Sequence, residues 1–165
     1  MDPKVINIVD SMKKMSEIKD YYIFQPGYLP LKVKFNINTP ASKKDIQKLK
    51  KYGLPKDYID FMTLTDGASL FEEGWGGARI DIYSIKEVFE WKDYIQKSGF
   101  FVEGDFPIAS LRDVGQISIN LIKFISNKPY LRYPDESNCY FNLNFIDWLE
   151  QILMANGNEF WYFGK

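Results

Sequence analysis

The spacing of apolar residues along the chain predicts five amphipathic helices. Apolar side chains recur every three or four positions in each of them, which is the period of a helix with one buried face. The first of these segments contains Val5, Ile8, Val9 and Met12 on one stripe. The five segments are residues 4–19, 43–52, 55–65, 85–98 and 145–155.

Polar residues before two of these segments predict where the helices begin. Ser42 with Asp45, and Ser84 with Glu87, have the spacing of a capping box, in which each side chain accepts a hydrogen bond from the other's backbone N–H. Gly53 follows the second segment in the position typical of a helix C-terminus.

The remaining segments predict strands and turns. Residues 31–37 and 79–83 alternate between apolar and polar side chains, which is the period of a strand with one buried face. Residues 100–143 contain several short strand-like stretches separated by turn residues, and the aromatic stretch 21–28 is broken by a Pro-Gly pair that predicts a turn. The expected fold is a single α+β domain over residues 1–165, mainly an antiparallel sheet with flanking helices.

Composition narrows the chemistry available to such a domain. A chain of 165 residues with 45% hydrophobic residues can bury a substantial core. It contains no histidine, which excludes Ser-His and Cys-His nucleophiles and histidine-ligated zinc, and its lone Cys139 excludes an internal disulfide. No apolar run approaches the roughly 18–20 residues of a membrane span. We therefore expect a soluble cytoplasmic protein without cofactor or membrane partner.

The small net charge of −1 conceals an uneven distribution. Residues 1–56 hold twelve lysines and five acids, whereas residues 57–165 hold the other nine basic residues and seventeen acids. The lysines of 43–56 flank an apolar stripe, which favours a solvated helix face over contacts with nucleic acid phosphates. An acidic second part could instead complement a basic partner.

Several short motifs follow one another in residues 39–155, after a less diagnostic helix and strand in residues 1–38. The motifs are Leu54-Pro55, Tyr58 with Phe61, Asp66-Gly67, Ile82-Tyr83-Ser84, Glu87-Val88, and Phe106-Pro107-Ile108-Ala109 with Gly115. In this order they resemble the SUKH superfamily, and within it the cell-wall-assembly regulators of the Smi/Knr type. Ala109 departs from that pattern, because a glycine is common there.

This resemblance implies an α+β fold without a catalytic signature. Bacterial members look like immunity proteins, or antitoxins, that bind and neutralise a toxin domain, often a nuclease. Fungal members look like regulatory scaffolds in cell-wall assembly. The resemblance therefore predicts a non-enzymatic protein-binding module whose partner is a cognate toxin, with the scaffold role as the alternative.

Acidic residues and one tryptophan, in predicted turns and in the predicted strand 79–83, are the candidate contacts for such a partner. An aromatic side chain flanked by carboxylates has the composition of an interface hot spot. Two alternatives stay open: the tryptophan could pack on the sheet, and the paired acids could serve a carboxylate-based hydrolase. The candidates are Glu72, Glu73, Trp75 and Asp81, with Asp135 and Glu136 as a second patch.

Overall fold

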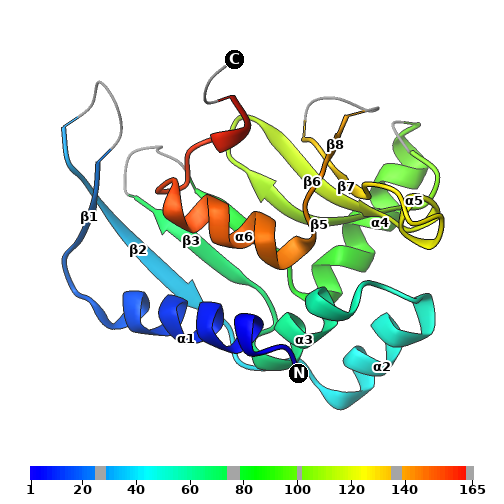
Figure 1. Ribbon diagram of the computed structural model, residues 1–165, viewed down its shortest axis with the longest axis horizontal. Coiled ribbons are helices and arrows are strands. Elements are labelled where there is room, and N and C mark those ends of the chain that lie inside the picture. Colours follow the sequence, from blue (N-terminus) through cyan, green and yellow to red (C-terminus); the bar gives the residue numbers. More distant parts are fainter. Residues whose placement is uncertain (25–28, 74–78, 100–101, 135–138, 163–165) are drawn as a thin grey trace.

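The chain folds into one antiparallel sheet whose strands follow their order in the sequence. The computed structural model describes residues 1–24, 29–73, 79–99, 102–134 and 139–162. Within these ranges the sheet has eight strands in the order β1 to β8, and helices precede, interrupt and follow it (Figure 1). The predicted α+β class is thus confirmed.

The helices and strands have the following bounds. The N-terminal half contains α1 (Pro3–Glu17), β1 (Tyr21–Ile23), β2 (Leu31–Ile37), α2 (Lys43–Tyr52), α3 (Lys56–Leu64), β3 (Ala68–Glu72) and β4 (Ile80–Ile82). The C-terminal half contains α4 (Ile85–Ser98), β5 (Asp105–Leu111), β6 (Gly115–Asn120), α5 (Leu121–Ile125), β7 (Leu131–Arg132), β8 (Tyr140–Phe141), α6 (Phe145–Met154) and a 3-10 turn (Phe160–Tyr162).

Three elements differ from the sequence predictions. The stretch predicted as a turn at 21–28 begins with strand β1, which pairs with β2 over only three residues and is too short to show a period. Strand β3 occupies residues for which no strand was predicted, and it ends at Glu72, which the sequence placed in a turn. Helix α5 replaces the end of a predicted strand, because the Asn120 side chain caps it by accepting a hydrogen bond from the Lys123 N–H.

Helices α1, α3 and α6 lie together over one face of the sheet (Figure 1). Aromatic side chains fill the space between α3 and α6: the ring of Phe145 packs edge-on against Tyr58 and Phe61, with centroids 5.0 and 5.2 Å apart. Trp148 and Phe61 are fully buried there. On the outside of this layer, Lys4 of α1 bonds to Asp147 of α6 at 2.6 Å.

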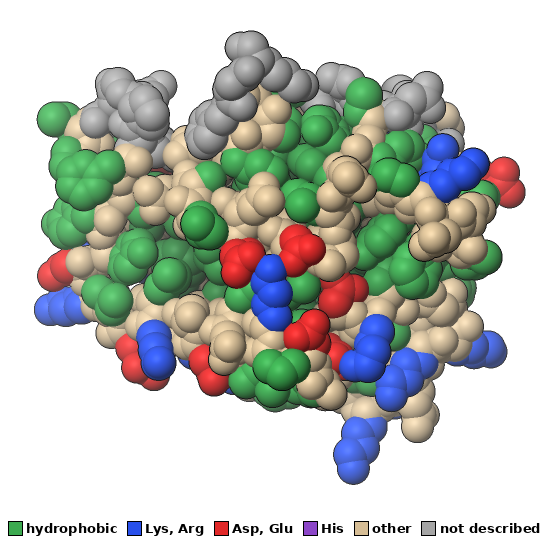
Figure 2. Space-filling view, viewed as in Figure 1, with side chains coloured by type: hydrophobic (Ala, Val, Ile, Leu, Met, Phe, Trp, Pro, Cys, Tyr) green, Lys and Arg blue, Asp and Glu red, His purple; other side chains and the backbone are tan. Residues whose placement is uncertain are grey.

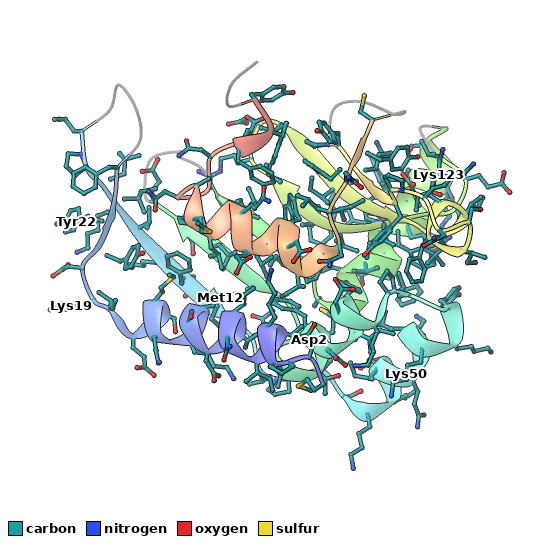
Figure 3. All side chains as sticks on the ribbon, in the orientation of Figure 1. Asp2, Met12, Lys19, Tyr22, Lys50 and Lys123 are labelled. Carbon is teal, nitrogen blue, oxygen red and sulfur yellow. The ribbon has the colours of Figure 1, made fainter. Side chains whose placement is uncertain are left out.

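Charged side chains lie at several places on this helix-covered face, and no single sign of charge dominates it (Figure 2). Figure 2 shows acidic and basic side chains close together near its centre, whereas basic side chains project at the corner where α2 lies. Figure 3 shows Met12 where α1 meets the sheet and Lys50 at the outer surface of α2. This agrees with the complete burial of Met12 and with the prediction of a solvated lysine face.

The opposite face of the sheet is covered over only part of its width. Helix α4 packs against β5, and Lys92 and Ile95 of α4 lie beside Ser118 of β6 on that face. Across β2, β3 and β4 the outward side chains are instead exposed or half-buried. We call this uncovered half the open face.

A turn at the end of α3 fixes β2, β3 and α4 relative to one another. The buried Thr65 hydroxyl donates to the carbonyls of Asn38 and Gly67 at 3.0 and 2.7 Å. The first N–H of α4, on Ile85, donates to the Asp66 carboxylate at 2.8 Å. Gly67 has φ +86°, and a Cβ there would lie 2.5 Å from the Ile82 carbonyl oxygen, so this turn requires glycine.

Gly67→Ala should therefore destabilise the protein by about 3 kcal/mol or more, because left-handed strain adds to a collision with rigid backbone. Gly53→Ala is the matched control, since Gly53 has φ +76° but nothing within 4 Å of an added Cβ. It should cost about 1–2 kcal/mol from strain alone. Urea denaturation of both variants measures the difference, and equal costs would contradict this account of the turn.

Phe61→Ala should lower the free energy of unfolding by about 3–5 kcal/mol, because it opens a cavity between α3 and α6. The matched control is Phe24→Ala, since the Phe24 side chain is 69% exposed. Urea denaturation followed by circular dichroism is the measurement. A Phe61 variant no less stable than the Phe24 variant would show that the α3–α6 packing is wrong.

Candidate functional site

Polar side chains from three strands meet on the open face. We call Asn36, Ser69, Glu72, Arg79 and Asp81 the sheet-face cluster. Asn36 lies on β2, Ser69 and Glu72 lie on β3, Asp81 lies on β4 and Arg79 directly precedes β4. Their side chains interact with one another, so the cluster is a defined arrangement.

A bulge in β3 places Glu72 on the open face. Ser69 pairs with Asn36 and Glu72 pairs with Lys34, so three steps along β3 match two steps along β2. In a regular strand, side chains three positions apart point to opposite faces. Here Phe71 has φ +55° and a buried side chain, and this extra residue returns Glu72 to the face of Ser69.

Arg79 holds the carboxylates of the cluster together. Its Nε donates to both oxygens of Asp81 at 2.8 Å, and one terminal nitrogen donates to Glu72 at 3.4 Å. The Ser69 hydroxyl donates to Asp81 at 2.6 Å, and the Asn36 amide donates to Glu72 at 2.6 Å. The hydrogen bonds to Asp81 raise the pKa of Arg79, so the guanidinium stays charged.

Two hollows flank the cluster on the open face. The first, of about 630 Å³, lies between β2 and the end of β3. Its charged lining consists of Lys32, Lys34, Glu72 and Glu73. The second, of about 410 Å³, lies between β4 and α4, and we call it the β4–α4 hollow.

The β4–α4 hollow combines carboxylates with aromatic rings. Asp81 and Glu87 both line it, together with Tyr83 and Trp91. The Tyr83 and Trp91 rings stack at 18° with centroids 5.9 Å apart, and Trp91 remains 38% exposed. Such a site presents negative charge beside flat apolar surface.

The pKa of Tyr83 depends on burial and on the charges that line this hollow. Burial is the main cause that raises the pKa of its phenol. The negative charges of Asp81 and Glu87 raise that pKa further, whereas hydrogen bonds with Ser110 and Gln116 lower it. Both carboxylates therefore act on the same ring.

The structure brings together three of the residues proposed from the sequence. Glu72, Glu73 and Asp81 lie on the open face, although Glu72 ends a strand and does not lie on a turn. Trp75 lies outside the described residues, as do Asp135 and Glu136.

Sequence reasoning did not select Arg79, Tyr83, Glu87 or Trp91 for the site. Glu87 and Trp91 are four residues apart on α4, so helical spacing could have placed them on one face. Arg79 gave no such signal, because its role depends on the pairing of β3 with β4.

The placement of the Glu72 and Asp81 carboxylates can be compared with what a carboxylate-based hydrolase requires. Glycoside hydrolysis needs two carboxyl groups on either side of an open space for the scissile bond. Between Glu72 and Asp81 that space holds the Arg79 guanidinium. These two carboxylates therefore form an ion-paired surface and do not flank a free cleft.

Two kinds of arrangement are absent from the described ranges. Over residues 1–24, 29–73, 79–99, 102–134 and 139–162, no group of three or more Asp, Glu, Cys or His side chains is placed to hold a metal ion. In the same part of the chain, no helix has the length and apolar character to cross a membrane.

Comparison with known proteins identifies the fold family. The family model described as SMI1 / KNR4 family (SUKH-1) matches residues 39–151, which run from the end of β2 into α6. The chain is also similar to the uncharacterized protein YobM of Bacillus subtilis (strain 168). The two are 33% identical over 132 residues, covering 73% of this chain and 70% of the relative.

Glu72→Gln and Asp81→Asn should each change the free energy of unfolding by less than about 1 kcal/mol, because exposed ion pairs contribute little to stability. Each amide keeps one oxygen that accepts part of the existing hydrogen bonds, and water can replace the rest at these partly exposed positions. Urea denaturation at neutral pH tests this. A loss of several kcal/mol from either variant would mean that the sheet-face cluster is a structural element and not a surface free for binding.

Proposed function

The chain belongs to the SMI1 / KNR4 family (SUKH-1), and from this we propose that it is a non-enzymatic protein-binding module that acts as an immunity protein. Its partner is a protein toxin whose active site is basic, as the substrate channel of a nuclease is. The resemblance of the motifs to bacterial members of this family, which mostly look like immunity proteins, supports this proposal. The mechanism is occlusion, in which the open face covers the toxin's active site.

One observation supports this function above the others: the bulge at Phe71. A non-glycine residue at φ +55° is strained, and such strain persists where the surrounding structure compensates for it. Its consequence here is that Glu72 joins Asp81 on the open face. A fold that maintains strain to expose a carboxylate is well suited to recognition.

The charge of the open face defines the kind of partner. Acidic side chains outnumber basic ones around the cluster, because Arg79 is flanked by Glu72, Asp81 and Glu87. Lys32 and Lys34 border this acidic area in the first hollow, and Lys32 is itself paired with Asp20. The described linings of the two hollows together hold three bases against four acids, which are Glu72, Glu73, Asp81 and Glu87. Electrostatic complementarity steers association, so a basic patch on the toxin is the expected counterpart.

The partner is expected to be encoded beside this protein and to poison cells that lack it. Expressing the neighbouring gene with and without this chain tests the immunity role. Rescue of growth together with a stable complex supports it. A regulatory scaffold would leave growth unchanged and bind no toxin.

Replacing Glu72 with Gln and Asp81 with Asn together should slow association with the toxin by about tenfold at low salt, because loss of steering charge acts on the association rate. The loss should shrink as salt is raised, since screening weakens interactions beyond about a Debye length. Stopped-flow or surface plasmon resonance measures both rates.

The matched control is Asp10→Asn with Glu17→Gln, which removes the same charge from exposed positions of α1 on the other face of the sheet. It should leave the association rate within about twofold, because its charges do not face the partner. Equal slowing by both pairs would show that net charge alone matters, and would remove the open face from the binding site.

A further inference from the structure

We infer that the β4–α4 hollow receives an arginine side chain of the protein partner, with the guanidinium held by Asp81 and Glu87 and lying against Trp91. This inference rests on the proposed function, because it names the group that the partner presents to the open face. The hollow of about 410 Å³ is open at the surface beside the sheet-face cluster, so a side chain can enter it from a docked protein.

The carboxylates have acceptor capacity for such a group. Glu87 accepts two hydrogen bonds at its Oε2 atom, the capping-box bond from the Ser84 N–H at 2.8 Å and a further one from the Ser84 hydroxyl at 2.7 Å. Its Oε1 atom is not part of these bonds. A carboxylate can accept about four hydrogen bonds, so Asp81 also has room for a further donor beyond Arg79 and Ser69.

The positive end of the α4 dipole does not repel a cation here, because acidic side chains already cap it. Asp66 accepts from the Ile85 N–H, and Glu87 lies in the first turn. The pKa of Asp66 is raised, mainly by burial and further by the negative charges of Asp45 and Glu87. Asp45, Asp66 and Glu87 therefore all place carboxylates near the start of α4.

The aromatic wall favours a guanidinium over an ammonium ion. A guanidinium is planar and weakly hydrated, and it combines stacking on a ring with a forked hydrogen bond to carboxylate. Trp91 is the most favourable ring type for such a contact. Its position is fixed on one side by Tyr83 and on another by Tyr94, whose ring lies edge-on at 5.6 Å.

The open face already holds one guanidinium between carboxylates. Arg79 lies across two carboxylates and itself lines the β4–α4 hollow. An incoming arginine would place a second guanidinium beside Arg79, between Asp81 and Glu87. Arginine and tryptophan are both enriched among the residues that dominate binding energies, which fits a central anchor.

The test uses the isolated protein and a small probe, so it does not need the toxin. Nα-acetyl-arginine amide is titrated into 15N-labelled protein, and the indole N–H resonance of Trp91, assigned with Trp91→Phe, is followed by NMR. Nα-acetyl-citrulline amide has nearly the same shape without the charge, and Nα-acetyl-lysine amide has the charge without the plane. We expect a saturable shift with the arginine probe, a weaker one with lysine and none with citrulline.

Two variants locate the binding. Asp81→Asn should weaken binding of the arginine probe by about fivefold, as expected for losing a charged partner at a partly exposed site. Glu90→Gln is the matched control, because Glu90 lies on α4 within one turn of Glu87 but pairs with Lys86 outside the hollow. It should leave binding unchanged.

The inference is overturned if the arginine probe leaves the Trp91 resonance unshifted, if citrulline shifts it equally, or if Glu90→Gln weakens binding as much as Asp81→Asn. A toxin that depends on Glu72 and Asp81 while the arginine probe does not bind would retain the proposed function and reject this inference. A probe that binds as expected, with a toxin indifferent to the open face, would show that the hollow takes a guanidinium but would overturn its assignment to the toxin and remove the open face from the proposed binding site.

Discussion

The turn at Thr65, Asp66 and Gly67 is the constraint on which the rest of the arrangement depends. A single left-handed glycine lets the chain pass within contact distance of the β4–α4 junction. The turn then fixes the end of β2 through Asn38 and the start of α4 through Ile85. Because β2 and α4 are the two walls of the open face, the distance between them is set at this turn. The Asp66-Gly67 and Ile82-Tyr83-Ser84 motifs are separated in sequence, but they are in direct contact at this turn.

A second constraint connects the open face with the core on the other side of the sheet. The Phe71 ring, turned inward by the bulge, packs edge-on against Phe35 at 4.9 Å. A Cβ on Gly157, just beyond α6, would lie 2.8 Å from that ring, so the end of α6 is closely fitted to it. Packing around Phe71 can therefore compensate for its backbone strain. The aromatic core stabilises the conformation that exposes Glu72.

Local sequence signals predicted most of the elements, because their information is local. Helices α1, α2, α3, α4 and α6 have apolar stripes, and α2 and α4 also have side-chain caps; both are properties of a few neighbouring residues. Strand β3 was not predicted, because the inward turn of Phe71 breaks its alternation. Strand β1 exists through pairing with β2, and no period can show in three residues.

The site was predictable in composition but not in arrangement. Glu72 and Asp81 stood out as acids near a predicted turn, but their shared guanidinium depends on strand pairing that no short motif encodes. Trp91 is flanked by polar residues on a surface helix, and its place in the β4–α4 hollow depends on how α4 packs beside β4, which the sequence of α4 does not encode.

The ion-paired state of the open face has a consequence for binding. Carboxylates gathered on a surface without a cation would repel one another and adopt many rotamers, and a partner would then have to order them. With Arg79 in place, Glu72 and Asp81 are held by several hydrogen bonds before any partner arrives. Less side-chain entropy is lost on association, which is the general advantage of a preorganised interface. Arg79 thus reduces the net negative charge of the open face while it fixes the positions of Glu72 and Asp81. For a partner of complementary shape, this preorganisation contributes more to binding than the lost charge would.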